Sequence, residues 1–173
     1  MGAERTRTFL SRSPEATRAL GAALGRLLAP GTVVALDGDL GSGKTCFVQG
    51  LAAGLEVPDP VTSPTYALLQ SYSGRLELHH FDAYMEGRER ALLQDGGLEW
   101  MHADGVAVIE WAERVADVLP RPRLAVRFDH VGPTERRIAI ALDGDGPPAA
   151  QLAEILGGID ARTAAVQGLV EMR

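Results

Sequence analysis

A glycine-rich stretch in the first third of the chain has the residue types and spacing of a phosphate-binding loop. Residues 38–45 read GDLGSGKT and satisfy the pattern G-x-x-x-x-G-K-[ST] in full. Glycines allow consecutive backbone N–H groups to turn toward phosphate oxygens, because no Cβ stands in the way. Lys44 would then reach the terminal phosphates of a nucleotide, and the Thr45 hydroxyl would be placed to ligate Mg²⁺.

The alternative is a glycine-rich turn that matches the pattern by chance, which we estimate at about one in a thousand for a chain of this composition. An apolar, β-branched run precedes the loop at 32–36 and a helical pattern follows at 47–55, which is the context a phosphate loop requires. A dinucleotide-binding G-x-G-x-x-G does not fit, because its third glycine would fall on Cys46. Lys44 is also the only lysine in the chain, which otherwise carries sixteen arginines. A slender ammonium fits such a loop better than a branched guanidinium.

Two acidic residues end apolar strand patterns and are candidates to complete the site. Asp82 ends LELHHFD, and Glu110 ends VAVIE, where it shares a strand face with two valines. A carboxylate on a buried strand is costly unless a cation pairs with it. A metal ligand is the favoured interpretation of Glu110, against an acid at an exposed strand end. Asp82 is a weaker candidate, as a second acid near the metal or as a water-orienting base. His79 and His80 beside it are more often structural.

The segment 62–66, TSPTY, places hydroxyl groups in a loop after the helix that follows the phosphate loop. Such a loop can sense a γ-phosphate in nucleotide switches. From the residues alone, an ordinary proline turn is the simpler interpretation.

Length and composition restrict the class of protein. The 173 residues are 46% hydrophobic and carry a net charge of −6, which argues against a large basic surface for nucleic acid or anionic membrane. The single cysteine excludes an internal disulfide, and no apolar run approaches the ~20 residues of a membrane helix. Without an apolar signal segment, we expect a cytoplasmic protein.

The order of the elements predicts one α/β domain, a sandwich around a mixed β-sheet. It spans 1–173, with a core of about 13–142 and a helical tail of about 148–173. Ser13 and Pro14 predict the start of the first helix. LAVRFDHV and RRIAIAL, at 124–131 and 136–142, alternate like a pair of edge strands.

Taken together, these motifs resemble the TsaE family, small bacterial ATPases of tRNA threonylcarbamoyladenosine modification. The resemblance runs from about Glu15 to about Leu142. It rests on EATRALGAALG, the phosphate loop with its following helix, VTSPTYALLQSY, HHFDAY and VIEWAE, in that order. It implies a three-layer sandwich of the P-loop NTPase type that binds ATP with Mg²⁺.

The resemblance also implies roles for individual residues. Thr45 and Glu110 would hold the metal, and Lys44, Thr65, Asp82 and Glu110 would be the catalytic or switch residues. Arg137 would touch the nucleotide. The residues that would wrap the phosphates are Gly41, Ser42, Gly43, Lys44, Thr45 and Cys46.

The partners implied are the TsaD and TsaB proteins, which transfer the threonylcarbamoyl group, with tRNA reached only through that complex and no membrane involved. The chain departs from the family at Cys46, where a second threonine is usual, and at Ala83 and Met85, where leucine and arginine are usual.

Two alternative functions remain open from the sequence. The first is a P-loop small-molecule kinase, for which RPRLAVR at 121–127 is the one candidate for an arginine-rich lid. The second is a nucleotide-dependent assembly factor whose hydrolysis is incidental.

Overall fold

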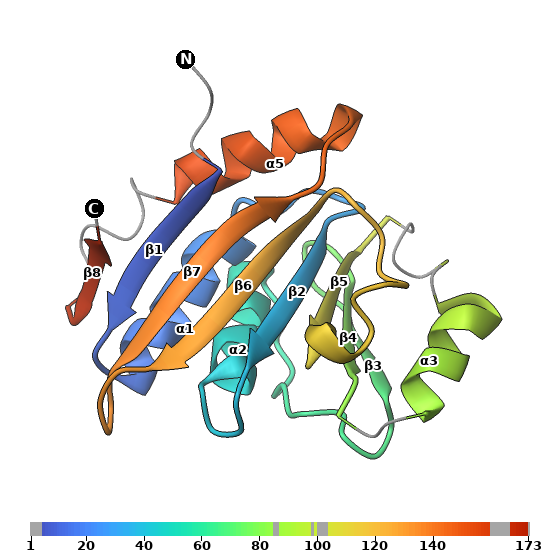
Figure 1. The fold of residues 1–173 in the computed structure, drawn as a ribbon, viewed down its shortest axis with the longest axis horizontal. Helices are drawn as coiled ribbons and strands as arrows, with labels where there is room; N and C mark the ends of the chain where they lie inside the picture. The colour runs from blue at the N-terminus through green and yellow to red at the C-terminus, as the bar shows by residue number, and fades with distance from the viewer. Residues whose placement is uncertain (1–4, 85–86, 98, 100–103, 160–166, 173) are drawn as a thin grey trace.

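The computed structural model describes residues 5–84, 87–97, 99, 104–159 and 167–172, and eight strands in this part of the chain form one mixed sheet (Figure 1). Their order across the sheet is β3-β4-β5-β2-β6-β7-β1-β8. The strands are β1 (Thr6–Ser11), β2 (Val33–Gly38), β3 (Leu69–Tyr72), β4 (Leu78–Asp82), β5 (Val106–Glu110), β6 (Arg123–His130), β7 (Arg136–Asp143) and β8 (Leu169–Met172).

The middle of the sheet is parallel and both sides are antiparallel. Strands β4, β5, β2 and β6 run parallel, whereas β3 pairs antiparallel with β4 on one side. On the other side β7, β1 and β8 continue the sheet in antiparallel pairs. The carboxyl ends of the parallel strands therefore meet at one edge, where ligands bind in open α/β sheets.

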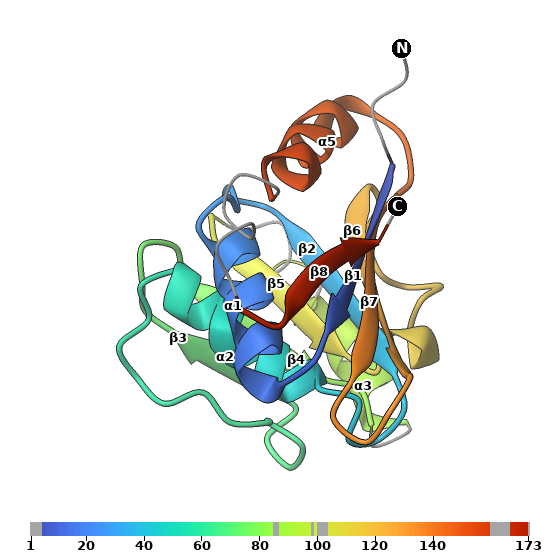
Figure 2. The same cartoon turned by 90° about the vertical axis from the view of Figure 1, so that its left-hand side faces the viewer.

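Helices cover the two faces of the sheet unequally (Figures 1 and 2). Helices α1 (Pro14–Gly25), α2 (Lys44–Gly54) and α5 (Pro147–Gly158) share the larger apolar core with one face of the sheet. On the other face a smaller core lies on β2, β4 and β5. Two short segments cover it: a π-helical turn at Leu93–Gly97, which directly follows α3 (Arg88–Leu92), and a 3₁₀ turn at Ala112–Arg114. The fold is thus the expected three-layer α/β sandwich, with a partial third layer.

Helices α1 and α2 approach each other so closely that several positions at their contact have room only for glycine. A Cβ on Gly50 would lie 2.0 Å from the carbonyl oxygen of Arg18, and one on Gly21 would lie 2.3 Å from that of Phe47. Real Cβ atoms essentially never come within 3.0 Å of another heavy atom. Because the obstacle is backbone, a larger residue would separate the helices and displace the helix that starts at the phosphate loop.

We expect Gly50→Ala to lower the free energy of unfolding by about 3 kcal/mol, because overpacking of this interface cannot be relieved by a rotamer change. Chemical denaturation measures the effect. The control is Gly157→Ala on α5, where a Cβ meets no atom within 4 Å; it is expected to stabilise the protein by about 0.5–1 kcal/mol through helix propensity. Equal effects of the two substitutions would contradict this account of the packing.

The start of α1 agrees with the sequence, since the Ser13 side chain accepts a hydrogen bond from the backbone N–H of Ala16 at 3.1 Å. The prediction of two edge strands was wrong. Strands β6 and β7 do pair, but β6 also pairs with β2, and β7 with β1. Strand β7 is not an edge because β1, which lies before the predicted start of the core at residue 13, pairs with it.

The predicted helical tail also needs correction. Helix α5 ends at Gly158, and Leu169–Met172 form β8, which pairs antiparallel with β1. The Glu171 carboxylate forms an ion pair with the guanidinium of Arg7, whose side chain is only 3% exposed. A buried charge is costly without its partner, so this contact favours the strand over further helix. Among the described residues, no helix is both long and apolar enough to cross a membrane.

Candidate functional site

The glycine-rich stretch forms a tight turn between the end of β2 and the start of α2, in the strand–loop–helix order that the sequence predicts. Gly41 and Gly43 adopt φ values of +73° and +104°, which only glycine adopts without strain. Gly43 is the N-cap of α2, so the first N–H groups of the helix open onto the loop. The loop is therefore built to bind an anion at a helix N-terminus.

Lys44 lies inside this turn and is 4% exposed. Its Nζ donates to the carbonyl oxygens of Gly38 at 2.5 Å and Asp39 at 3.0 Å, and it lies 3.8 Å from the centroid of the Trp111 ring. Burial lowers the pKa of the Lys44 ammonium, and the neighbouring acids, led by Glu110, oppose that shift. The ammonium group therefore lies in a partly desolvated site, close to carbonyl oxygens and acidic side chains.

Thr45 and Glu110 meet across the interface between α2 and β5. The Thr45 hydroxyl lies 3.0 and 3.1 Å from the two carboxylate oxygens of Glu110. Glu110 is 3% exposed, and its Oε1 also lies 2.8 Å from Nε2 of His80. Hydroxyl and carboxylate oxygens are the ligand type that Mg²⁺ prefers. This donor set fits the metal that the sequence implies.

Asp82 ends the neighbouring strand β4 and faces Glu110 in the parallel register. Its Oδ2 accepts hydrogen bonds from the hydroxyls of Ser63 at 2.7 Å and Thr65 at 3.0 Å. Its Oδ1 accepts from the backbone N–H of Tyr84 at 2.8 Å. Hydrogen bonds therefore connect the TSPTY loop to β4, the strand that carries Asp82.

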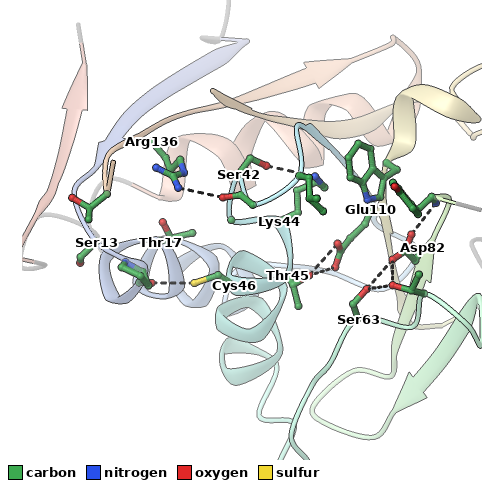
Figure 3. A pocket seen from close by; sticks show the side chains of 18 of the residues that line it. Ser13, Thr17, Ser42, Lys44, Thr45, Cys46, Ser63, Asp82, Glu110 and Arg136 are labelled. Carbon is green, nitrogen blue, oxygen red and sulfur yellow. Dashed lines mark hydrogen bonds between the residues drawn. The ribbon is translucent and has the colours of Figure 1, made fainter. Parts of the chain in front are cut away.

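These groups surround one pocket of about 610 Å³. Figure 3 shows Arg136 toward one end of the pocket, Asp82 toward the other, and the phosphate loop between them. The lining residues are Ser13, Pro14, Thr17, Leu40, Gly41, Ser42, Gly43, Lys44, Thr45, Cys46, Ser63, Thr65, Asp82, Tyr84, Glu110, Trp111, Pro133, Thr134 and Arg136.

The site residues inferred from the sequence all line this pocket, with the exception of Arg137. Successive residues of a strand point to opposite faces, so β7 presents Arg136 to the pocket and Arg137 to the other side of the sheet. Arg136 donates to the carbonyl oxygen of Gly41 at 3.2 Å, whereas Arg137 lies 3.4 Å from the Asp129 carboxylate. The structure therefore places Arg136 at the pocket and not the predicted Arg137.

Trp111 is a site residue whose role the sequence did not indicate. It follows Glu110 with φ +58°, a strained conformation for a bulky residue. This turn places the indole over Lys44 and 5.0 Å from the ring of Tyr84. The sequence shows Trp111 as the last residue of the motif VIEW, but it does not show in which direction the indole ring points.

Cys46, where the family usually has threonine, lines the pocket and directs its thiol toward the carbonyl oxygen of Pro14 at 3.2 Å. Burial raises the pKa of this thiol. The other departures are Ala83, which is buried in the smaller core, and Met85, which lies outside the described residues.

Glu113 carries a raised pKa close to the phosphate loop. Partial burial and the neighbouring Asp37 carboxyl group raise the pKa of Glu113 from 4.5 to about 7. The folded protein therefore binds more protons here than the unfolded chain between pH 4.5 and 7. The stabilisation by protonated Glu113 is complete below pH 4.5 and is lost as the pH rises through 7.

We therefore expect the Glu113→Gln variant to become more stable relative to the wild type as the pH rises from 5 to 8. The Glu113 side chain is exposed and solvent screens its interactions, so the change should not exceed about 1 kcal/mol, or about 2–4 °C in Tm. Thermal melts of both proteins across this range measure it. Glu154→Gln, on the exposed side of α5, controls for the loss of one negative charge. Parallel profiles of wild type and Glu113→Gln would contradict the assignment.

The chain is similar to known proteins over most of its length. The profile of the family described as "Threonylcarbamoyl adenosine biosynthesis protein TsaE" matches residues 11–138. A TsaE protein of Treponema pallidum is 43% identical over 132 residues, which are 76% of this chain and 98% of that protein. A TsaE protein of Bacillus subtilis is 38% identical over 135 residues, 77% of this chain and 84% of that one.

The fold has a counterpart among solved structures. A structure described as "Crystal structure of Bacillus subtilus YdiB" superposes with a TM-score of 0.74 and 29% identity, and the match covers 91% of this chain and 95% of that one. It thus extends beyond the family profile into the C-terminal part of the chain. The family profile, the identities and the shared fold confirm the resemblance seen in the motifs: this chain belongs to the TsaE family.

Proposed function

We propose that this protein is a Mg²⁺-dependent ATPase that acts with the TsaD and TsaB proteins in forming threonylcarbamoyladenosine on tRNA, in the cytoplasm. The observation that carries the proposal is the meeting of four groups at one pocket. Lys44 and Thr45 come from the phosphate loop, and Glu110 and Asp82 come from the ends of the adjacent parallel strands. Phosphoryl transfer needs this combination of a phosphate cradle, a cation, a metal site and an acid beside it.

The lining of the pocket suggests how ATP lies in it. Residues 41–46 would wrap the phosphates. The remaining space is bounded by the start of α1, at Ser13 and Pro14, and by Pro133 and Thr134 before β7. We assign this space to the base and sugar. Arg136 would act indirectly, by tying the phosphate loop to the β6–β7 connection through the Gly41 carbonyl.

Thr45 and Glu110 would hold Mg²⁺, which when bound neutralises charge that develops on the phosphates. Asp82 would orient the attacking water. Ser63 and Thr65 donate to the same Asp82 oxygen, so movement of their loop would change the position of that carboxylate. This link would make the TSPTY loop a switch that responds to the γ-phosphate.

Exposed apolar side chains support activation by partners. Leu40 and Tyr84 line the pocket with exposures of 79% and 43%, and Tyr66 in the TSPTY loop is 88% exposed. Large exposed apolar groups are typical of interaction surfaces. We propose that the TsaD–TsaB complex covers them and orders the site, with tRNA bound by the partners because this chain carries a net charge of −6.

The structure does not favour a small-molecule kinase. The three arginines considered for a lid do not line the pocket. Arg121 and Arg123 form ion pairs with Asp143, and Arg127 with Asp129. Arg123 and Arg127 lie on β6, which pairs with β2 and β7, and Arg121 lies just before it, so none of the three belongs to a separate lid segment.

The test is ATP hydrolysis with and without TsaD–TsaB, together with the level of threonylcarbamoyladenosine in tRNA after depletion of this protein. We expect slow hydrolysis alone, faster hydrolysis with the partners, and loss of the modification on depletion. Equal rates with and without partners would contradict partner activation. Unchanged modification would refute the role in tRNA while leaving nucleotide binding intact.

A further inference from the structure

A buried histidine lies directly beside the carboxylate that would hold the metal. His80 belongs to β4 and is 0% exposed. The parallel register pairs His80 with Val108 and Asp82 with Glu110, so His80, Asp82 and Glu110 share one face of the sheet. The imidazole Nε2 lies 2.8 Å from Oε1 of Glu110.

The direction of this hydrogen bond follows from the chemistry of the two groups. A carboxylate only accepts hydrogen bonds, so Nε2 of His80 must carry the proton and donate it to Glu110. The Thr45 hydroxyl reaches the same carboxylate from α2. Two donors from two different elements therefore hold the Glu110 carboxyl group in one orientation.

The second ring nitrogen of His80, Nδ1, argues against a purely structural role for this residue. Nδ1 of His80 is buried and has no hydrogen-bond partner in the described part of the chain. A buried histidine that serves the core alone would be expected to satisfy both nitrogens. In the described part of the chain, the hydrogen bond of the His80 ring is the one to Glu110. The neighbouring His79 is also buried, but its Nδ1 lies 2.9 Å from the Ser71 hydroxyl of β3, away from the pocket.

We propose that His80 is a positioning residue, which fixes the Glu110 carboxylate beside Thr45 so that the two can bind Mg²⁺ together. The inference rests on the proposed Mg²⁺-ATP site. In known metal sites, residues that do not touch the metal orient its ligands through hydrogen bonds. Loss of such a residue weakens metal binding about 10–100-fold. His80 would not contact nucleotide or metal itself.

The experiment measures the affinity of a fluorescent ATP analogue for the whole protein, first in EDTA and then across a Mg²⁺ titration. In His80→Leu, which keeps the bulk but has no donor, the Mg²⁺ concentration for half-maximal enhancement should rise about 10–100-fold. The affinity in EDTA should stay within about twofold, because the phosphate loop is intact. His79→Leu, equally buried on the same strand, should change neither quantity.

Two amide variants keep the test decisive if His80→Leu does not fold. Glutamine can place its amide nitrogen near the position of Nε2, whereas the shorter asparagine cannot reach Glu110. We expect His80→Gln to retain the Mg²⁺ dependence and His80→Asn to lose it. Equal Mg²⁺ requirements in both amide variants, or an unchanged requirement in His80→Leu, would overturn the proposal. A wild type with the same ATP affinity in EDTA and in Mg²⁺ would instead refute the metal site, and this inference with it.

Discussion

Lys44→Arg is expected to remove ATP binding while the protein remains folded. The ammonium is 4% exposed and sits between two loop carbonyl oxygens and the face of Trp111, at 2.5, 3.0 and 3.8 Å. A planar, branched guanidinium needs more room than this space offers. It would push against the loop backbone where phosphate oxygens must enter. We expect ATP affinity to fall at least about 100-fold, equivalent to about 3 kcal/mol.

Calorimetric titration with ATP measures this loss, and a thermal melt verifies the fold. Arg137→Lys is a suitable control, because it exchanges the same two side chains on the face of β7 opposite the pocket. It should bind ATP as the wild type does. A Lys44→Arg protein that binds ATP within threefold of the wild type would show that the loop tolerates the larger group, against the packing argument.

Glu110→Gln is expected to separate nucleotide binding from hydrolysis. The amide oxygen can still accept from His80 or Thr45, so the local structure should persist. The loss of the negative charge would weaken the proposed Mg²⁺ site, to which the protein would contribute this carboxylate and the Thr45 hydroxyl. We expect ATP affinity in EDTA to be unchanged or higher, since repulsion from the phosphates is removed. Hydrolysis should fall about 100–1,000-fold, the scale for loss of one preorganised charge-stabilising group.

Single-turnover hydrolysis of labelled ATP and reconstituted tRNA modification with TsaD–TsaB measure the two consequences. If the variant assembles with its partners and modification stops, turnover is required. If modification continues at the full rate, nucleotide binding alone supports it, and the protein is an assembly factor. Glu154→Gln on α5 controls for the change in net charge, and it should match the wild type in both assays.

Much of the site was determined by the sequence because the required features are local. A phosphate loop needs a strand, glycines at fixed offsets and a helix start, and these are contiguous in GDLGSGKT and its flanks. Asp82 and Glu110 stood out because an acid ends an otherwise apolar strand pattern. Parallel strands bring such ends to one edge, so the meeting of these two acids followed once both runs were strands.

The limits of the sequence lie where two distant segments must meet. The pattern of β7 did not reveal that β1 and β8 would extend the sheet beyond it, because strand pairing is a long-range property. Nor did it show which of two consecutive arginines would face the pocket. A shift of one residue reverses the face of every side chain on a strand, and the register of β7 on β6 selects Arg136.

The sequence by itself therefore determined the phosphate loop and the two strands that end in an acid, since each depends on residues near one another in the chain, and it indicated the family through the order of its motifs. Only the tertiary structure placed Trp111 over Lys44 and His80 against Glu110. Those contacts depend on a backbone turn with φ +58° and on the register of β4 along β5. Neither leaves a trace in the local pattern, because burial and pairing, not composition, decide where a side chain points.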